Sequence, residues 1–164
     1  MQKNYIGPQF ICLTDHHLKE TEITKISFEG YTLASGCYRK ISLGGGVCTF
    51  TNKNLAYQSM DVNQFCCEKT LEICAVKLHL KPFKLIIFCI YRATTGDLKQ
   101  FYTLMENILN HFLKPTVTFL ICGDLNINLL AKSNEAIKLL TLMNTYNLMQ
   151  VVDFPTRITN NTGT

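Results

Sequence analysis

The sequence predicts a single domain of mixed α/β class. Its 164 residues suffice for one core, which at this size buries roughly 70% of the surface of the unfolded chain. Short apolar runs typical of strands alternate with two segments whose apolar residues recur at three- and four-residue spacing, as in amphipathic helices. Neither an internal repeat nor a low-complexity linker divides the chain, so residues 1–164 are expected to form one unit.

Strands dominate the first half of the chain. They are predicted at residues 10–13, 31–35, 46–51, 71–80 and 84–91. Three consecutive glycines lead into the third strand, and without a following Lys-Ser/Thr they indicate a tight turn and not a phosphate loop. The link at residues 81–83 is short enough for a hairpin. Residues 85–90 are apolar on both faces, as are residues 117–122, so both segments are expected to be central strands with a layer on each side.

Helical periodicity is confined to the second half. The first helix is predicted at residues 98–112, with Asp97 as its N-cap and Pro115 beyond its end. A strand at residues 117–122 follows, and helical spacing returns at residues 133–146. Residues 148–164 are expected to be strand-like and then polar. The order is therefore strands, helix, strand, helix, strand, which is an α/β arrangement.

The charge and hydropathy of the chain narrow its possible partners. A net charge of +4, with no block of like charges, permits a polyanionic partner such as DNA without requiring one. The longest apolar run, residues 85–91, is too short to cross a bilayer, and the N-terminus lacks the pattern of a signal peptide. We therefore expect no membrane partner and an intracellular location, nuclear or cytoplasmic.

The eight cysteines indicate a reduced compartment. Cys12, Cys74, Cys89 and Cys122 each lie in an apolar run, where a free thiol behaves as a small hydrophobic side chain. No two cysteines have the C-x-x-C spacing, and the adjacent pair Cys66-Cys67 has no nearby histidine at ligand spacing. A zinc site is not expected.

Polar residues follow three of the predicted strands, at the point where each strand ends. Asp15 and two histidines follow the first strand, Tyr91 and Arg92 follow residues 84–90, and Asp124 and Asn126 follow residues 117–122. Side chains at the ends of neighbouring strands converge on one crevice in open α/β sheets. These three strand ends are therefore the candidate functional site.

The pair Asp124 and Asn126 admits two interpretations. In an extended segment, residues two apart point to the same side, and Gly123 lets the backbone turn without a Cβ clash. A carboxylate beside an amide suits a hard cation or an oriented water molecule. The alternative is a turn in which the aspartate accepts hydrogen bonds from backbone amides.

The other candidates also have a structural alternative. Asp15 could cap a helix in the region of residues 19–26, and the histidines beside it could be solvated loop residues. Tyr91 could be a core residue whose hydroxyl reaches solvent. Arg92 and Arg157 could be ordinary surface residues, whereas their functional interpretation is bidentate recognition of phosphate.

Five segments, in their order and spacing, resemble a known family. They are ICLTDHHL, GGGVCTF, IYRATTGDLKQF, LICGDLNINLL and VVDFPTRIT. As an ordered set they are similar to the endonuclease/exonuclease/phosphatase domain, related to DNase I, of insect non-LTR retrotransposons. The resemblance runs from about Phe10 to the last residue. It implies a four-layer α/β sandwich, and Mg²⁺-dependent (or Mn²⁺-dependent) cleavage of a DNA phosphodiester by a domain that precedes a reverse transcriptase in a polyprotein.

The resemblance also assigns roles to individual residues. Asp15 matches the position of a metal-binding glutamate, and Tyr91 matches a phosphate-contacting tyrosine. Asp124 falls on the aspartate that orients or deprotonates the attacking water, and Asn126 on an asparagine that holds the scissile phosphate. Thr156 and Arg157 lie in the PTR segment, which is near the DNA in that family, and Arg92 is a further candidate for phosphate contact.

Three departures from the family lead us to expect an incomplete sandwich that is weakly active or inactive by itself. Asp15 is one methylene shorter than the glutamate, the first strand of the family is not present, and the chain stops before the second aspartate and the Ser-Asp-His motif. An unpaired sheet edge and exposed apolar surface are then expected. Alternative functions are a non-catalytic DNA-binding remnant, and a phosphatase or abasic-site endonuclease of the same superfamily.

Overall fold

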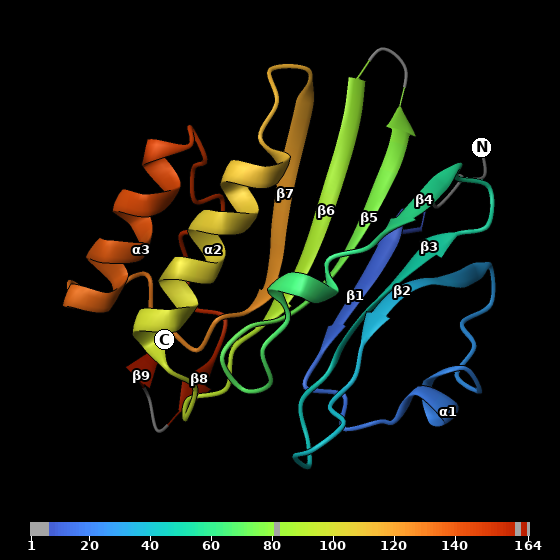
Figure 1. Ribbon diagram of the computed structural model, residues 1–164, viewed down its shortest axis with the longest axis horizontal. Coiled ribbons are helices and arrows are strands. Elements are labelled where there is room, and N and C mark those ends of the chain that lie inside the picture. The colour runs from blue at the N-terminus through green and yellow to red at the C-terminus, as the bar shows by residue number, and fades with distance from the viewer. Residues whose placement is uncertain (1–6, 81–82, 160–161, 164) are drawn as a thin grey trace, which may run out of the picture.

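The computed structural model describes residues 7–80, 83–159 and 162–163, and it confirms the mixed α/β class (Figure 1). Strands and helices alternate in the second half of the chain, as the periodicity predicts. In chain order the elements are β1 (Phe10–Thr14), α1 (Glu20–Ile23), β2 (Tyr31–Cys37), β3 (Val47–Asn52), β4 (Tyr57–Met60), the short 3₁₀ turn η1 (Asn63–Phe65), β5 (Glu72–Leu80), β6 (Phe83–Tyr91), α2 (Leu98–Phe112), β7 (Val117–Asp124), α3 (Asn134–Thr145), β8 (Ile158–Thr159) and β9 (Thr162–Gly163).

Two sheets form the centre of the molecule. The first has the strand order β1-β3-β2 and is antiparallel throughout. The second has the order β4-β5-β6-β7, in which β6 and β7 are parallel and the other neighbours antiparallel. Because a parallel pair needs a long crossover, α2 connects β6 to β7 across the face of this sheet. A separate two-stranded ladder joins β8 to β9.

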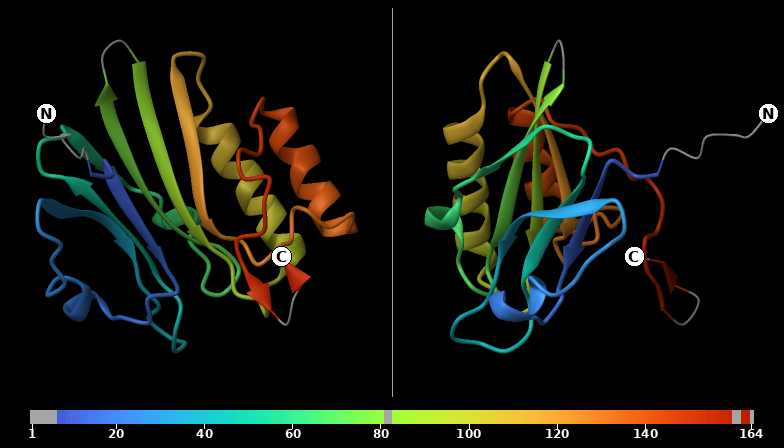
Figure 2. Two further views of the ribbon diagram at one scale, coloured as in Figure 1. Left: turned by 180° about the vertical axis from the view of Figure 1, so that it is seen from behind. Right: turned by 90° about the vertical axis from the view of Figure 1, so that its right-hand side faces the viewer.

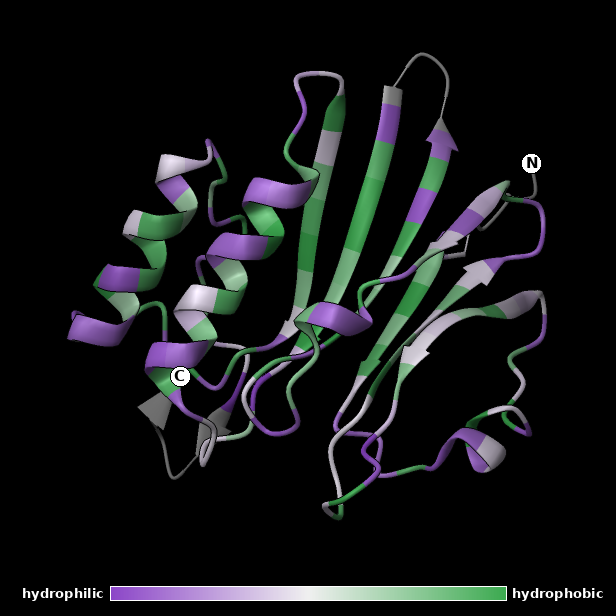
Figure 3. Ribbon diagram, in the orientation of Figure 1, coloured by the Kyte–Doolittle hydropathy of each residue, from purple (hydrophilic) through white to green (hydrophobic). Residues whose placement is uncertain are grey.

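The elements stack in four layers. Helices α2 and α3 cover one face of the second sheet, the first sheet packs against the other face, and α1 lies on the outside of the first sheet (Figures 1 and 2). Within the second sheet, β6 and β7 are hydrophobic over most of their length (Figure 3). The predicted four-layer α/β sandwich is thus the observed architecture, with a thin outer layer on the α1 side.

The apolar face of α2 shows why its sequence forms a helix here. Its buried residues recur at helical spacing and pack against Phe88 of β6 in the largest apolar cluster. The predicted N-cap is confirmed, since the Asp97 carboxylate accepts a hydrogen bond from the Gln100 N–H at 2.8 Å. In α3, the Ser133 hydroxyl accepts the corresponding bond from the Ala136 N–H.

Several predictions of local structure were incomplete or wrong. Strand β4 and the turn η1 were not predicted, because the short polar segment that contains them has no strong periodicity. Residues 148–157 form no regular strand, although their composition is strand-like. The predicted central position holds for β6, but β7 is the edge strand of its sheet within the described residues and is only partly buried. Part of the predicted hairpin link, residues 81–82, lies outside the described residues.

Within residues 7–80, 83–159 and 162–163, no helix has both the length and the apolar character needed to cross a membrane.

Candidate functional site

The three predicted strand ends meet at one edge of the sandwich. In the second sheet Tyr91 is the register partner of Asp124 on one side and of Glu72 on the other, so three polar side chains come from adjacent strands. Strand β1 lies against β6 and β7 from the first sheet and ends at Thr14, one residue before Asp15. The fold therefore brings both sequence-predicted acids to the same end of the two sheets.

Asp15 is held in an exposed turn by two contacts. Its backbone has a φ of 52°, and its Oδ1 accepts a hydrogen bond from the Gly45 N–H at 3.0 Å. The Nε2 of His17 lies 3.1 Å from the same oxygen. The N-cap of α1 is Lys19, so Asp15 does not have the capping role that was its structural alternative. The glycine loop and His17 instead fix the direction of the carboxylate.

Tyr91 is the register partner of Asp124 and lies close to Asp15. Its side chain is largely buried, and burial raises the pKa of the phenol, which the negative charge of Asp15 and a hydrogen bond to it raise further. The guanidinium of Arg39 lies 5.8 Å from the centre of the Tyr91 ring and acts in the opposite direction. The hydroxyl is therefore held in its protonated form, in which it donates a hydrogen bond.

Asp124 and Asn126 form a tight turn at the end of β7. The Asn126 N–H donates to Asp124 Oδ1 at 2.9 Å, as the turn interpretation of this pair predicts. Asn126 has a φ of 49°, so the segment is not extended at this residue. Its side-chain amide donates to the Arg92 carbonyl at 2.7 Å, which fixes the amide against the end of β6. The turn positions both side chains, and this role is compatible with a function for Asp124.

Gly123 is required by the close approach of β6 and β7. Its φ is 130°, and a Cβ atom at this position would lie 1.9 Å from the Ile90 carbonyl oxygen. No side chain fits there without separating the two strands. The glycine therefore lets Asp124 begin its turn directly beside Tyr91.

The environment of Arg92 does not fit the predicted role of this side chain in phosphate contact. The residue is 6% exposed, and its guanidinium donates to the Leu125 carbonyl at 2.8 Å and the Asn126 carbonyl at 2.9 Å. Further bonds reach the carbonyls of Ala93 and Gly96. The reason is physical: a buried guanidinium must satisfy its donors, and the carbonyls of two neighbouring loops do so. The Arg92 side chain therefore stabilises the loop that carries Asn126.

Thr156 and Arg157 lie in the exposed segment after α3. Thr156 lines an open groove of about 1050 Å³ together with Asp124 and Asn126, so the fold brings it to the site. Arg157 is exposed. Much of the groove is apolar, and exposed side chains such as Leu130, Phe154 and Val151 line it beside the β7 edge. The exposed apolar surface expected from the sequence is present here.

A buried ion pair beneath the site was not predicted. Glu72 is 1% exposed, and its Oε1 accepts a hydrogen bond from Arg39 Nε at 2.6 Å. It also accepts from the N–H groups of Gly46 and Lys69. Glu72 thus holds the glycine loop, which in turn holds Asp15. The sequence contains no clear signal for this pair, because β5 also carries Lys77 and His79, so a charged residue in the strand does not distinguish Glu72.

The loop between β2 and β3 is held in a similar way at the surface. The Glu68 carboxylate accepts hydrogen bonds from the N–H groups of Lys40, Ile41 and Ser42. Burial alone would raise the pKa of Glu68, but these bonds outweigh it and lower the pKa to about 2. The loop is therefore fixed, although Ile41 and Leu43 at its tip are almost fully exposed.

The donor set at the site suits a weakly held hard cation. Asp15 offers an exposed carboxylate whose second oxygen is free of the two contacts made by Oδ1, whereas Glu72 is neutralised by Arg39. Mg²⁺ usually keeps several waters and binds through one or two carboxylates together with substrate phosphates. Within the described part of the chain, no three His, Cys, Asp or Glu side chains are grouped to hold a metal ion. The residues thus fit a cation that arrives with a phosphate.

Comparisons with known proteins identify the fold. No family model matches the sequence, and no curated protein matches it. Among solved structures, the endonuclease domain of TRAS1, a telomere-specific non-LTR retrotransposon, superposes with a TM-score of 0.60 at 13% identity, over 80% of this chain and 60% of that chain. TDP2 of D. rerio complexed with a single-strand DNA product superposes with a TM-score of 0.53 at 10% identity, over 88% and 54%.

A humanized form of D. rerio TDP2 carrying 14 mutations gives a TM-score of 0.54 at 12% identity, over 80% of this chain and 53% of that chain. At these identities the likeness shows the fold alone. The chain has a DNase I-like fold, as the resemblance in its motifs implied, and it spans between 53% and 60% of the length of these structures.

Proposed function

We propose that this chain carries part of a site that binds a DNA phosphodiester with Mg²⁺ or Mn²⁺ and cleaves it by hydrolysis. The observation that carries the proposal is the position of Tyr91, which is the register partner of Asp124 and lies within reach of Asp15. Two acids and a protonated phenol then face one phosphate from three adjacent strand ends. The DNase I-like fold of the chain supports this chemistry.

Each of the chain's own residues has a role that its contacts allow. Asp15 would hold the cation through its second oxygen, Oδ2, with the Gly45 N–H fixing the direction of the carboxylate. The Tyr91 hydroxyl would donate a hydrogen bond to a phosphate oxygen. Asp124 would orient the attacking water and accept its proton. A divalent cation, when bound, supplies stabilisation of the charge that develops on the phosphate.

Asn126 and the segment after α3 would hold the substrate. The Asn126 amide donates one hydrogen to the Arg92 carbonyl and has a second hydrogen for a phosphate oxygen. Thr156 lies in the groove beside it, and Arg157 is exposed and able to contact the DNA backbone. In this proposal Arg92 supports the loop from within and does not touch the phosphate.

We further propose that the chain belongs to a retrotransposon protein that also carries a reverse transcriptase and acts in the nucleus or cytoplasm. Support comes from the ordered motifs in the sequence and from the likeness in fold to the TRAS1 endonuclease domain. Turnover by these 164 residues alone is expected to be weak or absent. In this proposal only Asp15 is assigned to the cation, and its side chain is one methylene shorter than that of the glutamate it replaces.

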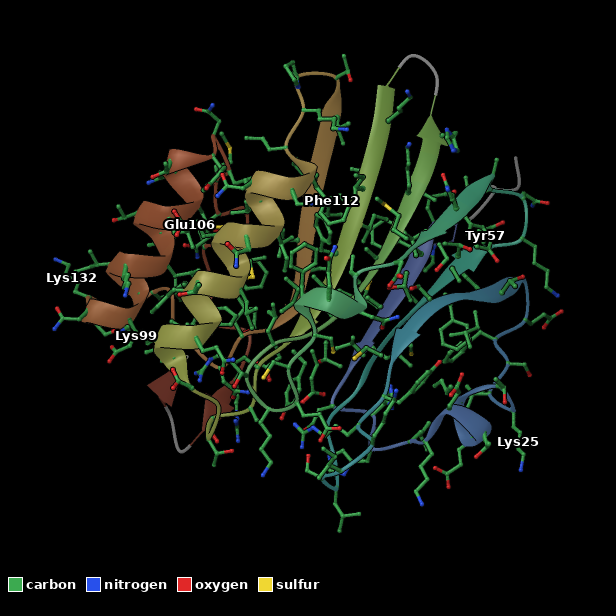
Figure 4. All side chains as sticks on the ribbon, in the orientation of Figure 1. Lys25, Tyr57, Lys99, Glu106, Phe112 and Lys132 are labelled. Carbon is green, nitrogen blue, oxygen red and sulfur yellow. The ribbon has the colours of Figure 1, made fainter. Side chains whose placement is uncertain are left out.

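A nicking assay on supercoiled plasmid with Mg²⁺ tests the cleavage step. Any nicking should be slow, should require the cation, and should be lost in Asp124→Ala. Glu106→Ala is the control, because Glu106 lies exposed on the outer face of α2, away from the site (Figure 4). Robust nicking that Asp124→Ala abolishes would overturn the expected weak activity. Nicking that persists in Asp124→Ala would overturn the assignment of the site.

Binding of a fluorescent DNA duplex, measured by anisotropy with and without Mn²⁺, gives a readout that does not need turnover. The cation should tighten binding, and Asp15→Ala should remove that gain while leaving the cation-independent part. If Mn²⁺ has no effect on the wild-type chain, the metal-assisted site is refuted. Salt-sensitive binding alone would then favour a DNA-binding module without catalysis.

A further inference from the structure

Several cysteines gather between the two sheets, directly below the site, and four of them lie on neighbouring strands. Cys12 comes from β1, and Cys74, Cys89 and Cys122 come from β5, β6 and β7. Cys74 and Cys89 are fully buried, whereas Cys12 and Cys122 are only partly buried. The proposed cleavage uses none of these thiols, and they are not grouped to hold a metal ion.

Cys12 and Cys122 face each other across the interface between the sheets. Their Sγ atoms are 3.3 Å apart, so a disulfide would require the sulfurs to approach by about 1.3 Å. The further hydrogen-bonding contacts of these sulfurs are weak, with Thr49 Oγ1 at 3.6 Å from Cys12 Sγ and the Phe88 carbonyl at 3.5 Å from Cys122 Sγ. We propose that Cys12 and Cys122 form an oxidation site, a dithiol that thiol–disulfide oxidants convert to a bond between β1 and β7.

Access distinguishes this pair from the other thiols of the cluster. Cys122 lines the open groove beside β7, and the facing Cys12 is likewise only partly buried, so a small disulfide can reach both sulfurs. Cys89 is sealed from solvent and donates to the Leu13 carbonyl. It is also the register neighbour of Cys122 on a parallel strand, within one sheet. The inter-sheet pair is therefore the one that an oxidant can cross-link.

The two thiols differ in their reactivity. The contact with the Cys122 thiol lowers the pKa of Cys12, whereas the same contact raises the pKa of Cys122. Because the thiolate is the nucleophile, Cys12 is the residue that attacks first. The facing thiol of Cys122, whose Sγ is 3.3 Å from that of Cys12, then completes the reaction.

The reaction balances with a small disulfide, such as oxidised glutathione, as the oxidant. The Cys12 thiolate attacks one sulfur of the reagent, its S–S bond breaks, and one glutathione thiolate leaves. Cys122, losing its proton to solvent, attacks the Cys12 sulfur of the mixed disulfide and releases the second glutathione. The protein loses two protons and two electrons, and one molecule of oxidised glutathione becomes two of the reduced form.

The bond would join the chain segments that carry the two acids of the site. Cys12 lies three residues before Asp15, and Cys122 lies two residues before Asp124. The cross-link would span 110 positions of the sequence, and a long loop of this kind restricts the unfolded chain most. Oxidation should therefore raise the midpoint of thermal unfolding by roughly 10–20 °C.

The test is oxidation of the native, reduced full chain with oxidised glutathione, followed by alkylation, intact mass and peptide mapping. We expect a product lighter by two hydrogens, with Cys12 linked to Cys122. Cys12→Ser and Cys122→Ser should each prevent it, whereas Cys67→Ser, which changes a partly exposed thiol outside the cluster, should not. The wild-type map does not depend on whether the serine variants fold.

Three results would overturn the proposal. One is an unlinked product under conditions in which Cys67 becomes glutathionylated. Another is a map in which Cys89 or another cysteine is the linked partner. The third is a glutathione adduct that stays on Cys12 or Cys122 without resolving to the internal bond. The proposal does not depend on DNA cleavage, so it stands or falls separately from the proposed function.

Discussion

Replacing Glu72 by alanine should destabilise the domain strongly, because it leaves a buried charge without a partner. Glu72 is 1% exposed and the Arg39 side chain 7%, and their contact is 2.6 Å long. Breaking a buried pair by removing one partner costs about 3–5 kcal/mol. The N–H groups of Gly46 and Lys69 also lose their acceptor, although Arg39 keeps a bond to the Leu43 carbonyl. We expect a loss of about 4 kcal/mol in the free energy of unfolding.

Urea denaturation followed by far-UV circular dichroism measures this loss, which should lower the midpoint by about 2 M. Glu68→Ala is the matched control, since Glu68 also accepts several backbone N–H bonds but does so at the surface, where water replaces them at a cost of about 1 kcal/mol. Adding Arg39→Met to Glu72→Ala should recover part of the loss by removing the unpaired charge. Equal stability of the Glu72 and Glu68 variants would refute the reasoning.

Three further predictions concern the loops and strand ends around the site. Because the folded pKa of Glu68 is about 2, below its unfolded value, the stability that this carboxylate contributes is complete above about pH 4.5 and is lost as pH falls towards 2. Unfolding curves across that range should converge for the wild type and Glu68→Gln, and a constant difference would contradict the assignment. Gly123→Ala should lower the free energy of unfolding by about 2–4 kcal/mol, since the new Cβ would lie 1.9 Å from the Ile90 carbonyl oxygen. A thermal midpoint equal to that of the wild type would show that the two strands are not so close. Arg92→Ala should lower the free energy of unfolding by about 2–4 kcal/mol, because it leaves buried carbonyls unpaired. Arg157→Ala should leave stability unchanged and should reduce, by about 1, the slope of the logarithm of the DNA-binding constant against the logarithm of the salt concentration. The reverse pattern would exchange the roles of the two arginines.

The parts of the fold that could be predicted from the sequence are those with strong periodicity. Strand β6 is apolar from Leu85 to Ile90, and α2 combines an apolar stripe with an aspartate N-cap, so pattern and structure agree. Strand β7 was wrongly predicted to be a central strand, whereas it is an edge strand within the described residues. An apolar run indicates that a strand is buried, but it does not show which elements bury it. Strand β4 was missed because four mostly polar residues carry no periodic signal.

The candidate site was predicted as a set of strand ends, and this much follows from topology. Asp15, Tyr91 and Asp124 come together because their strands are neighbours. The environment of Arg92 did not follow, since sequence position does not distinguish an arginine that faces solvent from one that satisfies loop carbonyls. The Glu72–Arg39 pair is likewise invisible in the sequence, because the two residues lie 33 positions apart and come together only where the two sheets pack.

The most direct test of the site uses Mn²⁺ as a paramagnetic probe with the ¹⁵N-labelled chain and a short DNA duplex. If Asp15, Tyr91 and Asp124 form one cation and phosphate site, broadening should be confined to the amides around these residues. Asp15→Ala should abolish it, and Glu106→Ala should not. Broadening centred elsewhere, such as at His79 or His111, or broadening unchanged in Asp15→Ala, would contradict the existence of this site.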